Sequence, residues 1–108
     1  MPRRVLHLRI CTSEAGESEL IPFLRAARPF YEAPGGIRVR LLRSASDPRE
    51  WLEIVEYDDE PTFARDDARV REDPEMGRWL ARWRQLLEGA PGVEVWEDCT
   101  EALTEPEA

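Results

Sequence analysis

The stretch VLHLRIC, residues 5–11, decides the fold at the start of the chain. It places leucine or isoleucine at every second position, and this alternation predicts a β-strand in which Leu6, Leu8 and Ile10 share one face. The opposite face holds residues of a different kind: Val5, His7, Arg9 and Cys11. If the leucine face covers a hydrophobic core, the face that carries the only histidine of the chain needs another neighbour.

Downstream of this strand, turn residues divide the chain into helical and extended segments. A helix is predicted over residues 18–32, where apolar residues recur at helical spacing between Gly16 and the sequence APGG. Two strands follow in GIRVRLLRS (residues 36–44) and EWLEIVEY (residues 50–57). The short polar turn SASDP between them predicts a hairpin.

The second half of the chain predicts a broken helical region and a last strand. Asp59 and Pro61 are typical of a helix start, and Asp73 with Pro74 ends that helix and begins another. The later helix carries an apolar stripe at helical spacing: Met76, Trp79, Leu80, Trp83, Leu86 and Leu87. The sequence GAPG ends it, and VEVWEDC, residues 93–99, is the fourth strand.

This order of elements, βαββαβ, predicts an α+β fold of the ferredoxin-like type. Four antiparallel strands form one sheet in the order 4-1-3-2, and the helices cover one face of it. A chain of 108 residues is one domain, which we place at residues 1–100, followed by an acidic, disordered tail at residues 101–108.

Composition excludes several classes of partner. The net charge of −8 argues against binding to nucleic acid or to an anionic membrane, because both need clustered positive surface. No apolar run approaches the ~18 residues of a membrane span, and no signal peptide is recognisable, so we expect a cytoplasmic protein. Cys11 and Cys99 fit no metal or redox motif and are expected to be free thiols.

The uncovered face of the predicted sheet is chemically mixed. Besides the first strand it is expected to carry aromatic, aliphatic and charged residues: Arg38, Arg40, Leu42, Trp51, Glu53, Val55, Tyr57, Glu94, Trp96 and Asp98. A solvated face rarely exposes this much aromatic surface, and a second core does not hold so many ions. We therefore expect this face to be half-buried against a partner, which is a second copy of the chain.

Several segments together resemble the dimeric α/β-barrel superfamily, and most closely its antibiotic-biosynthesis-monooxygenase (ABM) type. They are VLHLRI, APGGIRVRLL, REWLEIVEY, EPTFARDDARVREDPEMGRWLARW and VEVWED, and they cover about residues 3–99. The resemblance implies a homodimer in which two sheets pack face to face, with a cavity between sheet and helices or toward the barrel interior. Among the activities it implies is cofactor-independent monooxygenation of phenolic compounds. The haem-degrading members use an asparagine, which this chain lacks.

For a phenol monooxygenase, the residues on the uncovered face offer a catalytic set. His7 is the candidate base, because imidazole titrates near neutral pH, and Arg9, Arg38 or Arg40 is the candidate for stabilising the resulting anion. Tyr57 and Trp96 are expected to stack on a planar substrate.

Each of these residues also has a structural interpretation. His7 can form a hydrogen bond across the dimer, and Arg9 can pair with Glu53 or Glu94 across strands. Trp79 is explained by core packing, or alternatively by a place in a pocket wall.

No metal or cofactor is expected. His7 and Cys11 lie four strand residues apart, ~13 Å, which is too far to chelate one ion. Two classes of function stay open. One is a cofactor-free enzyme acting on a small aromatic or phenolic compound, and the other is a non-catalytic ligand-binding or regulatory dimer of the same fold. An accessible His7 beside a cavity favours the enzyme, and an interior filled by paired charges favours the binding protein.

Overall fold

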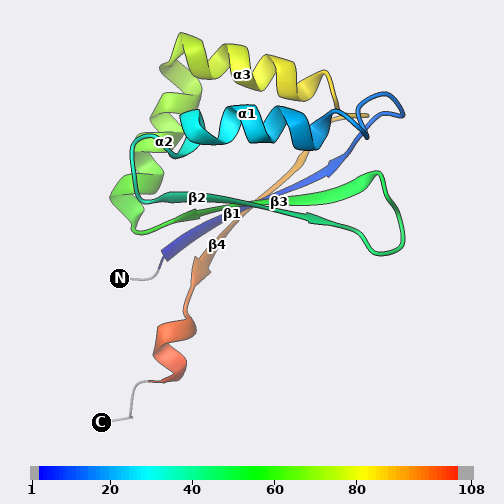
Figure 1. The fold of residues 1–108 in the computed structure, drawn as a ribbon. Coiled ribbons are helices and arrows are strands. Elements are labelled where there is room, and N and C mark those ends of the chain that lie inside the picture. The colour runs from blue at the N-terminus through cyan, green and yellow to red at the C-terminus, as the bar shows by residue number, and fades with distance from the viewer. Residues whose placement is uncertain (1–2, 105–108) are drawn as a thin grey trace.

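The computed structural model describes residues 3–104, and it has one sheet with helices on a single side (Figure 1). The elements are β1 (Arg3–Cys11), α1 (Leu20–Glu32), β2 (Ile37–Arg43), β3 (Glu50–Tyr57), α2 (Glu60–Glu72), α3 (Pro74–Arg84), β4 (Gly92–Asp98) and the 3-10 helix η1 (Thr100–Leu103). All neighbouring strands are antiparallel, in the order β2-β3-β1-β4. This is the predicted ferredoxin-like topology read from its other edge, so the α+β prediction is confirmed.

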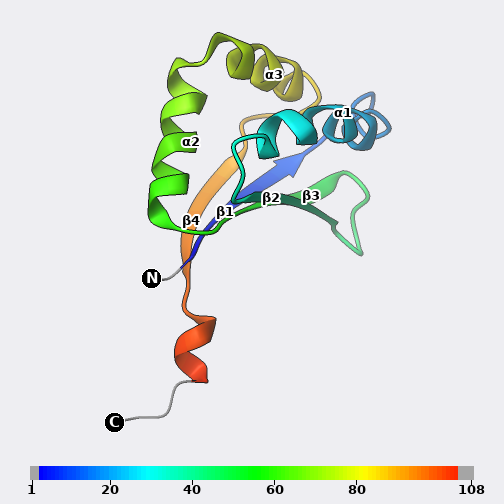
Figure 2. The ribbon, with the colours of Figure 1, turned by 60° about the vertical axis from the view of Figure 1, so that its left-hand side comes forward.

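The helix layer is held on the sheet by the apolar faces of α1 and α3. Leu20, Phe23, Leu24 and Ala27 of α1 are buried, and they belong to one core cluster with Trp83 of α3. Figure 2 shows α1 and α3 stacked over the strands, with α2 crossing at one end of the sheet. Among residues 3–104, no helix covers the opposite face of the sheet.

The joint between α2 and α3 lies at Asp73, as the sequence predicted. The backbone N–H of Asp73 makes the last helical hydrogen bond of α2, to the carbonyl oxygen of Arg69, and its extended backbone, with ψ 117°, ends that helix. Its side chain accepts a hydrogen bond from the N–H of Glu75 at 2.9 Å and so caps the start of α3. Pro74 occupies the first helical position, where its missing N–H removes no helical bond. Asp73 is therefore both the C-cap of α2 and the N-cap of α3.

We expect Asp73→Ala to lower the free energy of unfolding by about 1 kcal/mol, because the cap of α3 is lost. Chemical denaturation measures this change. Asp67→Ala is the matched control: it removes the same charge from an exposed pair with Arg71 and caps no helix. It is expected to change stability by less than about 0.5 kcal/mol. Equal losses in the two variants would show that the charge, and not the cap, matters.

The predicted orientation of the third strand is wrong. Leu6, Leu8 and Ile10 lie opposite Val55, Glu53 and Trp51, and directly paired residues share a face. Trp51, Glu53, Val55 and Tyr57 therefore lie under the helices, and Leu52 and Ile54 lie on the open face. Both faces of this strand are apolar, so alternation alone does not say which one is covered. The pairing with β1 decides it.

The hairpin carries the same information. Arg43 lies opposite Trp51, so odd-numbered residues of β2 share a face with odd-numbered residues of β3. Ile37, Val39 and Leu41 were correctly predicted to face the helices. The turn pairs odd-numbered residues of β2 with odd-numbered residues of β3, so the odd-numbered residues of β3 face the helices as well. The open face therefore consists of alternate residues from all four strands, and these include Val5, His7, Arg9, Cys11, Arg38, Arg40, Leu42, Leu52, Ile54, Glu56, Glu94, Trp96 and Asp98.

The chain leaves the sheet along the edge strand β4. Val93 and Val95 point to the helix side but stay exposed, and η1 projects beyond the end of the sheet (Figure 1). Residues 101–103 of the predicted disordered tail belong to η1, which corrects the prediction for them, and residues 105–108 lie outside the described part of the chain. Within residues 3–104, no helix is long and apolar enough to cross a membrane.

Candidate functional site

A pocket of about 80 Å³ lies between the helices and the covered face of the sheet. Its walls are mainly apolar: strands β1 and β2 contribute residues such as Leu8 and Val39, and α3 contributes Met76, Leu80 and Trp83. The spacing of these three α3 residues, four and then three, places them on one helix face. Val70 of α2 also lines the pocket and is 40% exposed, which places it at the mouth.

Glu53 is the central polar group of the pocket. It is 4% exposed, and its Oε1 accepts a hydrogen bond from Trp83 Nε1 at 3.1 Å. None of the ion pairs among residues 3–104 involves Glu53. Burial without a cation raises the pKa of this carboxyl to about 7, and the bond from Trp83 only partly opposes the rise. Glu53 can therefore take up or release a proton near neutral pH.

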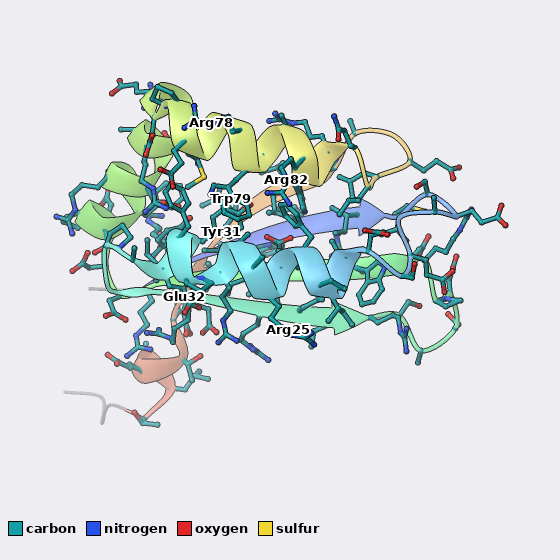
Figure 3. The ribbon with its side chains drawn as sticks, turned by 45° about the horizontal axis from the view of Figure 1, so that its top comes forward. Arg25, Tyr31, Glu32, Arg78, Trp79 and Arg82 are labelled. Carbon is teal, nitrogen blue, oxygen red and sulfur yellow. The ribbon has the colours of Figure 1, made fainter. Side chains whose placement is uncertain are left out.

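Tyr31 brings a second polar group from α1. Tyr31 lines the pocket, and its hydroxyl is buried and has no hydrogen-bond partner among residues 3–104. Burial raises the pKa of this hydroxyl above its usual range, and the charge of Glu53 adds to the rise, while Arg82 and Arg69 oppose it. Figure 3 shows Tyr31 in the space between α1 and α3. A neutral, unpaired hydroxyl beside a carboxyl is available to donate to a ligand oxygen.

Asp66 and Tyr57 form the other polar part of the pocket. Tyr57 donates to Asp66 Oδ2 at 2.6 Å, and Asp66 is only 9% exposed. The second carboxylate oxygen, Oδ1, is buried and accepts no hydrogen bond, although the guanidinium of Arg69 lies 3.9 Å away. Burial, followed by the bond to Asp66, raises the pKa of the Tyr57 hydroxyl.

His7, the predicted base, lies on the open face of the sheet and is not among the residues that line this pocket. Its ring centroid is 6.0 Å from that of Trp96, which is 51% exposed. The Nδ1 atom of His7 is buried and has no hydrogen-bond partner. The structure thus brings His7 and Trp96 together and keeps both away from Glu53.

The predicted anion-stabilising arginines are paired with carboxylates. Arg9 lies 3.0 Å from Glu94, one of the two partners expected from the sequence. Arg40 lies 3.6 Å from Glu56, and Arg38 lies 2.9 Å from Asp58. These pairs are partly exposed and contribute little stability. They cover the open face with matched charges.

The remaining two predicted ligand-binding residues both lie on the helix side of the sheet. Tyr57 was expected on the open face and lies in the pocket instead, because the register with β1 turns it there. Trp79 packs against Phe30 and Phe23, and the guanidinium of Arg82 lies 5.0 Å from its ring centre (Figure 3). Trp79 is half-buried and does not line the pocket.

Sequence reasoning missed Glu53, Tyr31 and Asp66 as site residues. A glutamate inside the apolar run WLEIV was a usable signal, since a charged residue on a covered strand face is rarely fully buried without a role. The contributions of α1 and α2 carry no such signal, because they depend on how the helices cross the sheet. Among residues 3–104, no three His, Cys, Asp or Glu side chains are grouped to hold a metal ion.

Comparison with known proteins identifies the fold. No protein-family profile and no curated protein sequence matches the chain. Solved structures do match: a protein from Bordetella bronchiseptica assigned as an antibiotic biosynthesis monooxygenase has a TM-score of 0.74 at 18% identity, covering 89% of this chain and 96% of that one.

Two further structures agree. A mutant of SnoaB, a cofactor-independent oxygenase from Streptomyces nogalater, has a TM-score of 0.73 at 18% identity, covering 89% of this chain and 92% of that one. A conserved protein from Methanosarcina mazei has a TM-score of 0.76 at 10% identity, covering 91% and 94%. The chain therefore has the fold of ABM-type proteins, and the resemblance seen in the sequence is confirmed at the level of fold.

Proposed function

We propose that this ABM-type chain is a cofactor-independent oxygenase of small phenolic compounds, and that the reaction takes place in the pocket over Glu53. The observation that carries the proposal is a buried carboxyl with a pKa of about 7 and no cationic partner, set in an apolar pocket with aromatic walls. Such a group is suited to take a proton from a weakly acidic substrate. SnoaB, with the same fold, is a cofactor-independent oxygenase.

The residues of the pocket suit the first step of such a reaction. Glu53 accepts the phenol proton, and the Tyr31 hydroxyl, which has no other partner, donates a hydrogen bond to the phenolate oxygen. The electron-rich ring then passes an electron to O₂ and combines with the superoxide formed. Loss of water from the resulting hydroperoxide leaves a quinone. The balance is one phenol and one O₂ giving one quinone and one water, so no external reductant is needed.

The pocket size limits the substrate. A dry cavity of about 150 Å³ is sufficient for benzene, and this pocket of about 80 Å³ is smaller. A single ring therefore enters only if side chains at the mouth, such as the exposed Val70, move aside. This favours compounds with one small ring.

The proposal includes a homodimer through the open face of the sheet. Trp96 and Leu42 are about half exposed there, between ion pairs whose charges are already matched. Exposing such apolar surface to water is unfavourable, and the same face of a second copy of the chain can cover it. We place the dimer in the cytoplasm, where Cys11 and Cys99, both unpaired, stay reduced.

Oxygen uptake with phenols that have a free ortho or para position, such as 2-methylphenol, tests the reaction. Glu53→Gln is expected to lower turnover at least ~100-fold, because the proton acceptor is lost. His7→Gln tests the other candidate base and is expected to keep turnover within a few-fold. If His7→Gln abolishes turnover and Glu53→Gln does not, the reaction belongs to the open face with His7 and Arg9.

Binding without oxygen uptake is the other outcome of interest. The matched ion pairs on the open face are what a non-catalytic binding protein is expected to show there. If the wild-type protein binds phenols by calorimetry and consumes no oxygen with any of them, the oxygenase proposal fails. The chain is then a ligand-binding dimer of the same fold.

A further inference from the structure

The charge of the pocket lining is one-sided. Glu53 and Asp66 are the charged side chains that line it, and the lining contains no arginine or histidine. The remaining lining residues are apolar, apart from the hydroxyls of Tyr31 and Tyr57 and the indole N–H of Trp83. A ligand in this pocket therefore meets carboxyl groups and aromatic faces, and no cation.

The nearby guanidinium groups are held by other partners. Arg69 donates to the backbone oxygen of Phe30 at 2.6 Å and lies 4.5 Å from the centre of the Phe30 ring, and its Nη1 is 3.9 Å from Asp66 Oδ1, beyond hydrogen-bond distance. Arg82 lies over the rings of Phe23 and Trp79 at 5.5 and 5.0 Å. Neither side chain is part of the pocket wall, and the guanidinium of Arg69 is already engaged by Phe30 and by the carboxylate of Asp66, so neither is free to neutralise an anionic ligand.

The polar groups form two separate poles. Glu53 and Tyr57 point to the same side of β3 and are four residues apart, which is ~13 Å along a strand. Tyr31 is influenced by the charge of Glu53, and Tyr57 by that of Asp66. One pole therefore consists of Glu53 and Tyr31, and the other consists of Asp66 and Tyr57.

Each pole has an unused hydrogen-bonding atom. The Tyr31 hydroxyl at the first pole and Asp66 Oδ1 at the second are buried and make no hydrogen bond. An unbonded carboxylate oxygen needs a donor, and leaving it unsatisfied costs about 1–3 kcal/mol. A carboxylate on the ligand leaves that oxygen unbonded and adds repulsion between like charges.

We propose that the pocket selects single-ring compounds that carry hydrogen-bond donors, hydroxyl or amino groups, at both ends, and that it rejects carboxylate analogues of the same shape. The selection rests on the proposed function, since it concerns the same pocket. The phenolic end lies at Glu53 and Tyr31, and the second donor binds Asp66 Oδ1.

Calorimetry with three matched probes tests the selection. 4-Hydroxyphenethyl alcohol has a donor at both ends, 4-ethylphenol lacks the second donor, and 4-hydroxyphenylacetate carries a carboxylate in its place. We expect the alcohol to bind at least ~10-fold more tightly than either analogue, which corresponds to one satisfied buried group. Tyramine, whose amine is also a donor, is expected to bind at least as well as the alcohol.

Asp66→Asn tests whether the second donor of the ligand binds at Asp66. Because this change removes the negative charge and supplies an amide donor, the preference for the alcohol over 4-hydroxyphenylacetate is expected to shrink at least ~5-fold. Asp67→Asn is the control, since it makes the same change one residue away, at an exposed side chain paired with Arg71. It is expected to leave the preference unchanged.

The outcomes separate the two proposals. If 4-hydroxyphenylacetate binds as tightly as the alcohol, or if Asp66→Asn leaves the preference intact, the proposed selection for two donors is wrong. The proposed function of the pocket is not affected by that result. If no probe binds the wild-type protein, both the selection and the proposed function fail. Should Asp66→Asn not fold, as judged by circular dichroism, the ranking of the probes on the wild-type protein decides.

Discussion

Glu53→Gln is expected to make the protein more stable at pH 8 by up to about 3 kcal/mol while it abolishes turnover. The carboxyl has a pKa of about 7 in the folded protein, and in the unfolded chain it has the ordinary glutamate value of 4.5. Below pH 4.5 the group is protonated in both states and has no effect on stability. Between pH 4.5 and 7 the unfolded chain loses its proton first, so folding becomes progressively less favourable, and above pH 7 the loss is constant.

Glutamine removes this dependence because it stays neutral and keeps an oxygen for the Trp83 indole N–H. Urea denaturation at pH 5 and pH 8, at one protein concentration, measures the effect. Wild type is expected to lose stability between these pH values through this group, and Glu53→Gln is expected not to. Glu56→Gln is the control, because Glu56 lies on the same strand but pairs with Arg40 on the open face. If Glu53→Gln is no more stable than wild type at pH 8, the pKa of Glu53 is not raised in the folded protein.

The second large effect concerns the dimer. Trp96→Asp is expected to weaken dimerisation at least ~30-fold, about 2 kcal/mol, because an exposed aromatic side chain of the proposed interface becomes a charge. Light scattering across a dilution series measures it. Wild type is expected near 25 kDa, twice the 12.5 kDa chain, and the variant near 12.5 kDa.

Val93→Asp is the matched control for the dimer. Val93 lies on the same edge strand, is 60% exposed, and points to the helix side. The same substitution there is expected to leave the mass near that of the dimer. A wild-type mass of 12.5 kDa at all concentrations contradicts the homodimer, and dissociation by Val93→Asp alone places the interface on the helix side of β4.

The sequence was sufficient to predict the order of the elements, the strand order and the break at Asp73. These follow from local signals: alternation in VLHLRIC, turn residues, and an Asp-Pro pair that both caps and starts helices. The faces of three strands were also predictable, because each has one clearly apolar side. The strand EWLEIVEY has two apolar sides, so its orientation depends on pairing with β1, which no local pattern states.

The candidate site depended on that one orientation. The sequence predicted Glu53 on the open face, and therefore favoured His7 and the arginines there as the site. In the structure Glu53 lies under the helices, where the polar groups of the pocket come together. Tyr31 and Asp66 reach it from α1 and α2, which are far apart in the chain. Their meeting depends on helix packing over the sheet, which is a tertiary property.

Titration by carbon-13 NMR shows directly whether Glu53 is a carboxyl in the helix–sheet pocket that exchanges its proton near neutral pH. Protein labelled at glutamate side-chain carboxyls gives one resonance for each, and the spectrum of Glu53→Gln identifies the one that belongs to Glu53. We expect a midpoint near pH 7 for that resonance, and a changed midpoint when 4-hydroxyphenethyl alcohol is bound. A midpoint near 4.5, unaffected by the probe, would contradict this expectation.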